Sequence, residues 1–395
     1  MVVTTLKADR IEVVDSLRGF AVFGILVSHC YYLFFLGDAT GTNVFDEEVS
    51  ILVRLFVNDK FYSLFSFLFG LSFSLMLSRT NDTRGKFYRR FAWRLLLLGL
   101  IGVLHNLHWT DDILSIYAFL GFILLAVNKL NNKTIFLIAV LLLLNVPSLL
   151  INLMQQPATP EAEQSAAATF AAFYNAMKNG SYLDTIRANI SAYPYKLQYY
   201  LYSGRFSFML GFFFLGLLSG RLRLFHQFND NKKMFWLIFR CVGVIALLFT
   251  ILSSILIISS EKFSAELNSY LRPLMKGQSI FLTLTYIAGM ALFFNRNSIK
   301  WLAKQFAIVG KMALTNYVLH SVLGTILLCG YGFGLINHSI SITVATLASI
   351  PLFVVMILFS HFWLATFSYG PLEWVWRTAT YLKIFPIKKV EFPLT

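Results

Sequence analysis

Two histidines and two aspartates occur within eight residues of one another, in the stretch 102–119 with the sequence GVLHNLHWTDDILSIYAF. They are His105, His108, Asp111 and Asp112. A histidine held by a carboxylate can act as a general base, because the carboxylate fixes the tautomer of the imidazole and stabilises the imidazolium that forms. The structural alternative is that one aspartate caps the following helix and that the histidines lie at a membrane interface. Capping requires only one acid, so we favour a catalytic site.

Other apolar segments also carry proton-active side chains. Arg18 lies three residues after Asp15, a spacing that pairs the two on one helix face, and it is also a candidate substrate ligand. His29 follows Arg18 by about 16 Å along a helix axis, at 1.5 Å per residue. This places His29 at the depth of the 102–119 stretch, as a further catalytic candidate.

A polar stripe runs through the late apolar segment 306–329. It comprises Lys311, Thr315, Asn316, Tyr317, His320 and Ser321. Asn316 and His320 are one helical turn apart, so they must face the interior of a bundle or a water-filled cavity. Hydrogen bonding between helices would by itself account for Asn316. We take His320 as a catalytic candidate, and Asn316, Tyr317 and His108 as candidate substrate ligands.

The composition indicates a membrane protein. The chain has 395 residues, of which 57% are hydrophobic and 13% charged, with a mean hydropathy of +0.67, which leaves too little polar surface for a water-soluble globule. Apolar runs of about 20 residues, the length of a membrane-spanning helix, recur along the whole chain without the alternation of a β-barrel. The net charge of +14 comes from Lys and Arg in short loops, so it reports membrane topology and gives no support to nucleic-acid binding.

We predict an all-α integral membrane protein with about ten transmembrane helices and both termini in the cytoplasm. The polar arm 1–13, with Lys7 and Arg10, and the basic loop 79–94 are expected in the cytoplasm, so the 102–119 hinge is expected at the outer face. A single domain comprises residues 1–153 with five spans, an outer amphipathic segment 154–205 that could be a lid or a spacer, and residues 206–395 with five spans and a cytoplasmic tail. The predicted spans are 14–36, 61–77, 93–107, 113–127, 135–153, 206–222, 235–258, 279–294, 306–329 and 340–367.

The sequence lacks the motifs of several enzyme classes. HExxH, GxSxG, a Walker loop and a GxGxxG after a strand do not occur in it, so metalloprotease, serine-hydrolase and nucleotide-hydrolysing functions are poorly supported. The histidines and acids are too widely spread to specify a metal site, and we expect none. We also find no internal repeat of the kind that many secondary transporters have.

Motifs along nearly the full chain resemble the YeiB-like family of bacterial inner-membrane proteins. The matching residues are Arg10-Ile11, Asp15 to Ala21, Gly24 to Leu26, Lys60-Phe61, Phe65 to Gly70, Arg89-Arg90, Gly102, His105, Asp112 to Leu114, Tyr117-Ala118, Gly310 to Tyr317, Gly370 to Trp374 and Trp376-Arg377. The family is similar in fold to transmembrane acyltransferases such as the lysosomal heparan-α-glucosaminide N-acetyltransferase. The resemblance therefore implies acyl transfer from a cytoplasmic thioester, with a membrane-embedded histidine.

Within the hinge, the resemblance selects His105 and Asp112, because only these two match recurring proton-active positions of the family. The family often has Asn near His29 and Gln near His320, so the resemblance does not extend a catalytic role to those two residues. His105 would deprotonate the acceptor, and Asp112 or Asp111 would orient it. An acyl-CoA co-substrate is implied, with no tightly bound cofactor. The phosphates of the acyl-CoA would be bound by basic residues on the cytoplasmic side. The candidates are Arg79, Arg84, Arg89 and Arg90.

The expected partners are the lipid bilayer of a bacterial inner membrane, a small-molecule or glycan acceptor, and a second copy of the chain in a homodimer. An alternative function is proton-coupled transport, in which His29, His105 and His320 form a proton relay with the acids. A third is a non-catalytic assembly partner that acts through the 155–205 segment.

Overall fold

The computed structural model describes residues 11–35, 43–154, 159–259, 265–338 and 340–389. Within these ranges the chain is helical, and the β contact recorded is an isolated bridge between Phe367 and Lys388. Most of the predicted basic arm, including Lys7 and Arg10, lies outside the described residues. The prediction of an all-α fold is confirmed.

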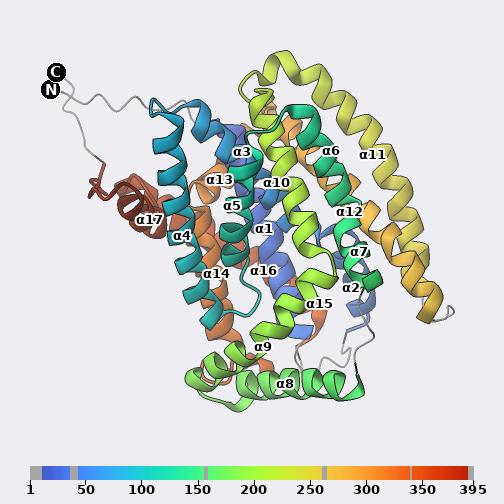
Figure 1. The fold of residues 1–395 in the computed structure, drawn as a ribbon. Helices are drawn as coiled ribbons and strands as arrows, with labels where there is room; N and C mark the ends of the chain where they lie inside the picture. Colours follow the sequence, from blue (N-terminus) through green and yellow to red (C-terminus); the bar gives the residue numbers. More distant parts are fainter. Residues whose placement is uncertain (1–10, 36–42, 155–158, 260–264, 339, 390–395) are drawn as a thin grey trace.

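The helices form a bundle crossed at one end by two further helices (Figure 1). The bundle consists of α1 (Glu12–Phe35), α2 (Asp46–Phe56), α3 (Lys60–Ser78), α4 (Arg84–His108), α5 (Leu114–Val127), α6 (Asn132–Leu143), α7 (Val146–Met154), α10 (Arg205–Arg221), α11 (Phe228–Ile258), α12 (Ala265–Phe294), α13 (Lys300–Lys311), α14 (Ala313–Leu328), α15 (Ile342–Leu347), α16 (Ser349–Thr366) and α17 (Pro371–Tyr381). Within the described residues, six stretches are long and apolar enough to cross a membrane, or nine if each of three bent helix pairs counts as one span. Every predicted span falls on one of these helices or pairs, with α5 as a shorter apolar helix of the bundle.

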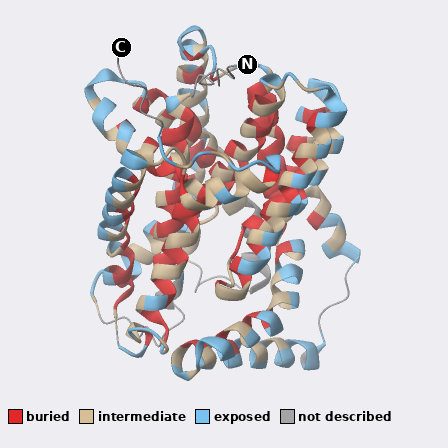
Figure 2. Cartoon of the chain, turned by 90° about the vertical axis from the view of Figure 1, so that its left-hand side faces the viewer, coloured by how far each residue is buried: buried red, intermediate tan, exposed pale blue. Residues whose placement is uncertain are grey.

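Burial separates the inner helices from the lipid-facing ones. Helices α3 and α10 are buried along most of their length. By contrast, α11 is 31 residues long, and only 17% of the residues in its apolar stretch are buried. Red buried positions gather inside the bundle in Figure 2. Large aliphatic side chains such as Leu104 on α4 and Leu248 on α11 remain about 60% exposed. Exposed apolar surface of this extent suits hydrocarbon, and the protein is a multi-pass membrane protein.

Glycines allow two pairs of inner helices to touch backbone to backbone. A Cβ atom at Gly19 of α1 would overlap the carbonyl oxygen of Phe306 in α13, and one at Gly310 of α13 would overlap that of Asp15 in α1. Helices α3 and α10 show the same reciprocal contact, through Gly70 and Gly216. Small residues of this kind are the usual means of close helix packing in membranes.

The predicted span 306–329 is not one continuous helix. It breaks at Met312 into α13 and α14, which meet at a bend of 81°. Glu373 at the start of α17 accepts hydrogen bonds from the backbone nitrogens of Leu314 and Thr315 (2.8 and 3.1 Å) and from the Thr315 hydroxyl (2.5 Å). These are amides of the first turn of α14, so a side chain from another helix stabilises the break.

The predicted amphipathic segment 154–205 forms α8 (Pro160–Asn179) and α9 (Tyr182–Tyr202). Helix α8 lies across the end of the bundle at which α4 ends (Figure 1). Helix α9 packs against α4, and Asn189 donates a hydrogen bond to the carbonyl of Leu107 (3.0 Å). The segment therefore covers the hinge.

Candidate functional site

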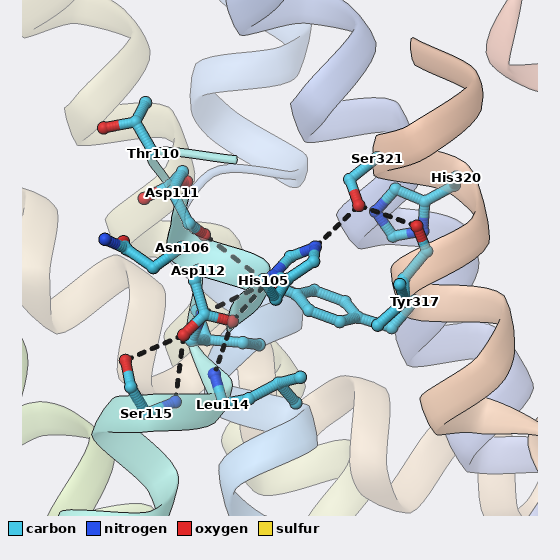
Figure 3. Close-up of polar contacts among 12 residues, drawn as sticks. His105, Asn106, Thr110, Asp111, Asp112, Leu114, Ser115, Tyr317, His320 and Ser321 are labelled. Carbon is cyan, nitrogen blue, oxygen red and sulfur yellow. Dashed lines mark hydrogen bonds and ion pairs between the residues drawn. The ribbon is translucent and has the colours of Figure 1, made fainter. Parts of the chain in front are cut away.

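The hinge between α4 and α5 brings His105 and Asp112 into direct contact. His105 lies in the last turn of α4, and Asp112 lies just before α5. The Nδ1 atom of His105 is 2.8 Å from Oδ1 of Asp112, and the residues are 5% and 0% exposed (Figure 3). The two residues singled out by the family resemblance therefore form a buried pair.

The other contacts of Asp112 determine how the pair shares its protons. Its carboxylate also accepts from the backbone nitrogens of Leu114 and Ser115 (3.1 and 2.9 Å) and from the Ser115 hydroxyl (2.7 Å). Because Asp112 acts as an acceptor throughout, we assign the proton of a neutral His105 to Nδ1. The Nε2 atom then carries the lone pair, as a general base requires.

Nε2 of His105 meets the hydroxyl of Ser321 on α14. The two atoms are 2.6 Å apart, and Ser321 is 1% exposed (Figure 3). Ser321, His105 and Asp112 thus have the connectivity of a Ser-His-Asp triad, which is recognised by geometry and does not require a GxSxG sequence. The sequence marks Ser321 only as one member of a polar stripe, and 216 residues separate it from His105.

A second histidine system lies beside the first. His320 donates from Nδ1 to the carbonyl of Asn316 (3.1 Å), so Nε2 of a neutral His320 accepts from Nδ1 of His29 (2.9 Å). Nε2 of His29 then faces Oδ2 of Asp111 at 4.0 Å. The predicted candidates His29, His320 and Asp111 are therefore neighbours. In the part of the chain that the structure describes, no group of three or more His, Cys, Asp or Glu residues could hold a metal ion.

Basic and aromatic side chains from α9 and α10 surround Asp111. It accepts from the hydroxyl of Tyr200 (2.7 Å) and lies 3.6 Å from the guanidinium of Arg205. Lys196 of α9 donates to the carbonyls of Thr110 and Asp112. A cavity of about 30 Å³, which is room for a water-sized polar group, is lined by Ile25, Ser28, His29, Val57, Asp59, Phe61, Tyr62, Asp111, Ile113 and Arg205.

Three residues near the hinge were predicted as substrate ligands, and each makes different contacts: they are His108, Asn316 and Tyr317. His108 binds the hydroxyl of Thr325 through Nε2 (2.8 Å), in the same last turn of α4 as His105. Asn316 donates to the carbonyl of Val309 and to the hydroxyl of Ser360, which ties α14 to α13 and α16. Tyr317 packs its ring against His105, with centroids 5.1 Å apart.

A larger cavity, of about 370 Å³, lies between the hinge and the basic end of α3 and α4. Its lining runs along α3 from Phe65 to just beyond the helix end at Arg79, roughly 21 Å at 1.5 Å per residue. Tyr317 and Leu114 also line it, and these residues contact His105 and Asp112, respectively. The cavity therefore extends from the basic end of the bundle to residues that contact the His105 pair, while His105 and Asp112 themselves lie behind its lining.

Charge in this cavity is concentrated away from the hinge. Its Lys, Arg, Asp and Glu lining residues are Arg18, Arg79, Arg94, Lys311, Asp15 and Glu373, four basic and two acidic. Arg18 pairs with Asp15 (2.6 Å), as predicted, and Arg94 lies over the ring of Trp376 at 3.6 Å. The remaining lining is largely apolar.

Of the four predicted phosphate ligands, the cavity lining includes Arg79. Arg84, Arg89 and Arg90 lie in the first two turns of α4, and Arg90 pairs with Asp82. Arg94 and Lys311 line the cavity in their place. The sequence could have suggested Arg94, because it follows Arg90 by one helical turn.

Comparisons with known proteins give the family. Residues 219–383 match a family described as "Protein of unknown function (DUF418)". The chain is 30% identical over 420 residues to "Uncharacterized protein YxaH" of Bacillus subtilis (strain 168), with 98% of both chains covered. It is 29% identical over 390 residues to "Uncharacterized protein YeiB" of Escherichia coli (strain K12), with 94% of this chain and 96% of that protein covered. The resemblance inferred from the motifs is confirmed: the chain belongs to the YeiB-like, DUF418-containing family.

Proposed function

We propose that the protein is a transmembrane acyltransferase of the bacterial inner membrane. It transfers an acyl group from a cytoplasmic acyl-CoA-type thioester to a hydroxyl or amine at the outer face. The observation that carries the proposal is the buried His105–Asp112 pair directly behind Tyr317 and Leu114, which line an apolar cavity with basic groups at its far end. Such a cavity suits a ligand with an anionic head and an apolar tail.

Each part of the cavity has a role in this reaction. Arg79, Arg94 and Lys311 attract the phosphates of the donor, and the apolar walls hold its acyl chain. Tyr317 marks the depth at which the thioester meets the site, because it borders both the cavity and His105. His105 takes the proton of the attacking group, and Asp112 stabilises the imidazolium. The space between Asp111 and His29 lies on the acceptor side.

Labelled acetyl-, octanoyl- and palmitoyl-CoA, incubated with the purified protein in nanodiscs of bacterial membrane lipid whose headgroups offer hydroxyl and amine acceptors, test this function through release of free CoA. The protein should consume at least one of these donors, and His105→Ala should lower the rate by about 10²- to 10⁴-fold, the usual contribution of a general base. His361→Ala, which removes an exposed histidine from α16, should keep the original rate. Full activity in the His105 variant would exclude His105 as the base.

The second histidine system favours one alternative, proton-coupled transport. His320, His29 and Asp111 form a chain of proton-active groups inside the bundle. In liposomes containing the protein, a pH-sensitive dye would report proton movement driven by a solute gradient. Such movement without any acyl-CoA, together with no CoA release in the first experiment, would favour transport over acyl transfer.

A further inference from the structure

The hydroxyl of Ser321 has the position of a nucleophile. Its Oγ atom lies 2.6 Å from Nε2 of His105 and 2.8 Å from the carbonyl oxygen of Val318. We propose that Ser321 carries the acyl group as a covalent ester between donor and acceptor, so that the reaction proceeds in two half-reactions. This inference rests on the proposed acyltransferase function, which by itself requires only His105 as a base.

The hydrogen-bond network leaves His105 ready to activate this hydroxyl. Asp112 holds the proton of His105 on Nδ1, so Nε2 presents its lone pair to Ser321. The single hydroxyl proton of Ser321 can point to Val318 or, by rotation about the Cβ–Oγ bond, to His105. Nucleophile, base and orienting acid therefore stand in direct sequence, which is the general signature of an activated nucleophile.

The position of Ser321 on α14 gives the donor a route to it. Ser321 follows Tyr317 by four residues, so the two side chains lie on one face of the helix. Tyr317 lines the large cavity and contacts His105. A thioester that enters from the basic end therefore reaches the level of Tyr317, and Ser321 lies one helical turn beyond that level, behind the cavity lining.

Both half-reactions balance without a further reagent. In the first, the Ser321 proton moves to Nε2 of His105, Oγ bonds to the acyl carbon, and the carbon–sulfur bond breaks; the thiolate takes the proton from His105 and leaves as a free thiol. In the second, His105 takes the proton of the acceptor hydroxyl or amine, the acceptor bonds to the acyl carbon, and the bond to Oγ breaks. The proton then returns to Ser321.

The test is to look for the acyl-enzyme in the absence of an acceptor. Full-length protein in nanodiscs is incubated with the acyl-CoA that it consumes, quenched in acid, and analysed by intact mass and peptide mapping. We expect one acyl group per chain on the peptide that contains Ser321, and its loss in Ser321→Ala and His105→Ala. Ser321→Cys should carry the acyl group as a thioester that neutral hydroxylamine removes.

Matched variants separate this role from a structural one. Ser253→Ala removes the hydroxyl of a fully buried serine on α11 and should label like the original protein. If Ser321→Ala retains donor consumption and acceptor acylation, or if the acyl group maps to another residue, Ser321 is not the carrier and His105 acts on the acceptor directly. If the original protein consumes no acyl-CoA at all, the acyltransferase function itself fails.

Discussion

At the scale of single residues, Asp112 has two roles that the sequence presents as alternatives. Its carboxylate accepts from the amides of Leu114 and Ser115 at the start of α5, as a capping acid does. The same carboxylate holds Nδ1 of His105. The rigid start of α5 thereby orients the imidazole, so capping is part of the proposed chemistry.

Two substitutions at Asp112 should separate these roles. Asp112→Asn keeps an oxygen for the α5 amides, but its NH₂ group can replace the carboxylate opposite Nδ1 and favour the wrong tautomer of His105. We expect acyl transfer to fall by about 10²- to 10⁴-fold in kcat. The KM for acyl-CoA should change little, because the carboxylate contacts the base and leaves the donor cavity intact.

Asp112→Ala should lose the same activity and also the cap, which is worth about 0.5–2 kcal/mol of stability. Thermal unfolding of the two variants in detergent measures that difference. A fully active Asp112→Asn would show that Asp112 is only a cap.

Contacts between site residues that are close in the sequence could be predicted, whereas contacts between distant residues could not. His105 and Asp112 are seven residues apart, so their contact follows from one helix end and one turn. Ser321 meets His105 only because α14 lies beside the hinge, and no local pattern encodes that contact. Local spacing thus predicted the cluster of two histidines and two aspartates, the family resemblance selected the pair within it, and the third member, Ser321, required the fold.

At the scale of elements, the length of the apolar runs predicted where the helices lie in the sequence but not where they break or how their ends are capped. The predicted span 306–329 has a continuous apolar pattern, and nothing within it shows that Glu373, 58 residues after Thr315, caps α14. Because of this capped break, α14 runs at 81° to α13, and α14 carries Tyr317, His320 and Ser321.

The glycine contact between α1 and α13 supports this arrangement and can be tested. Gly19→Ala would place a methyl group on the carbonyl of Phe306, so the helices must separate, at a cost of about 1–3 kcal/mol. Thermal unfolding in nanodiscs should report the loss. Activity should fall as well, because Asp15 and Arg18 of α1 line the donor cavity with Lys311 of α13.

Gly85→Ala is the matched control for this prediction. Gly85 lies in α4, and a Cβ there would meet nothing within 4 Å. The replacement should be neutral or stabilise the helix by up to about 1 kcal/mol. Equal unfolding temperatures for the Gly19 and Gly85 variants would mean that α1 and α13 can separate without cost.

At the scale of the whole molecule, the two ends of the bundle differ. At one end, Arg79, Arg94 and Lys311 line the large cavity. At the other, α9 covers the hinge, with Lys196 on the carbonyl of Thr110 and Tyr200 on Asp111. Under the proposed function, donor and acceptor would approach His105 from opposite faces of the membrane, with the basic end in the cytoplasm as the positive-inside rule predicts.

This arrangement predicts a sided reaction. Acyl-CoA does not cross membranes, so inverted vesicles, which expose the cytoplasmic face, should release CoA from added acyl-CoA. Sealed right-side-out vesicles should do so only after permeabilisation with detergent. Vesicles that contain His105→Ala give the background for both orientations.

The His105 pair is buried, and the large cavity approaches it from the basic end. Equal rates from either face of sealed vesicles would therefore contradict the donor route and leave the large cavity without its proposed ligand.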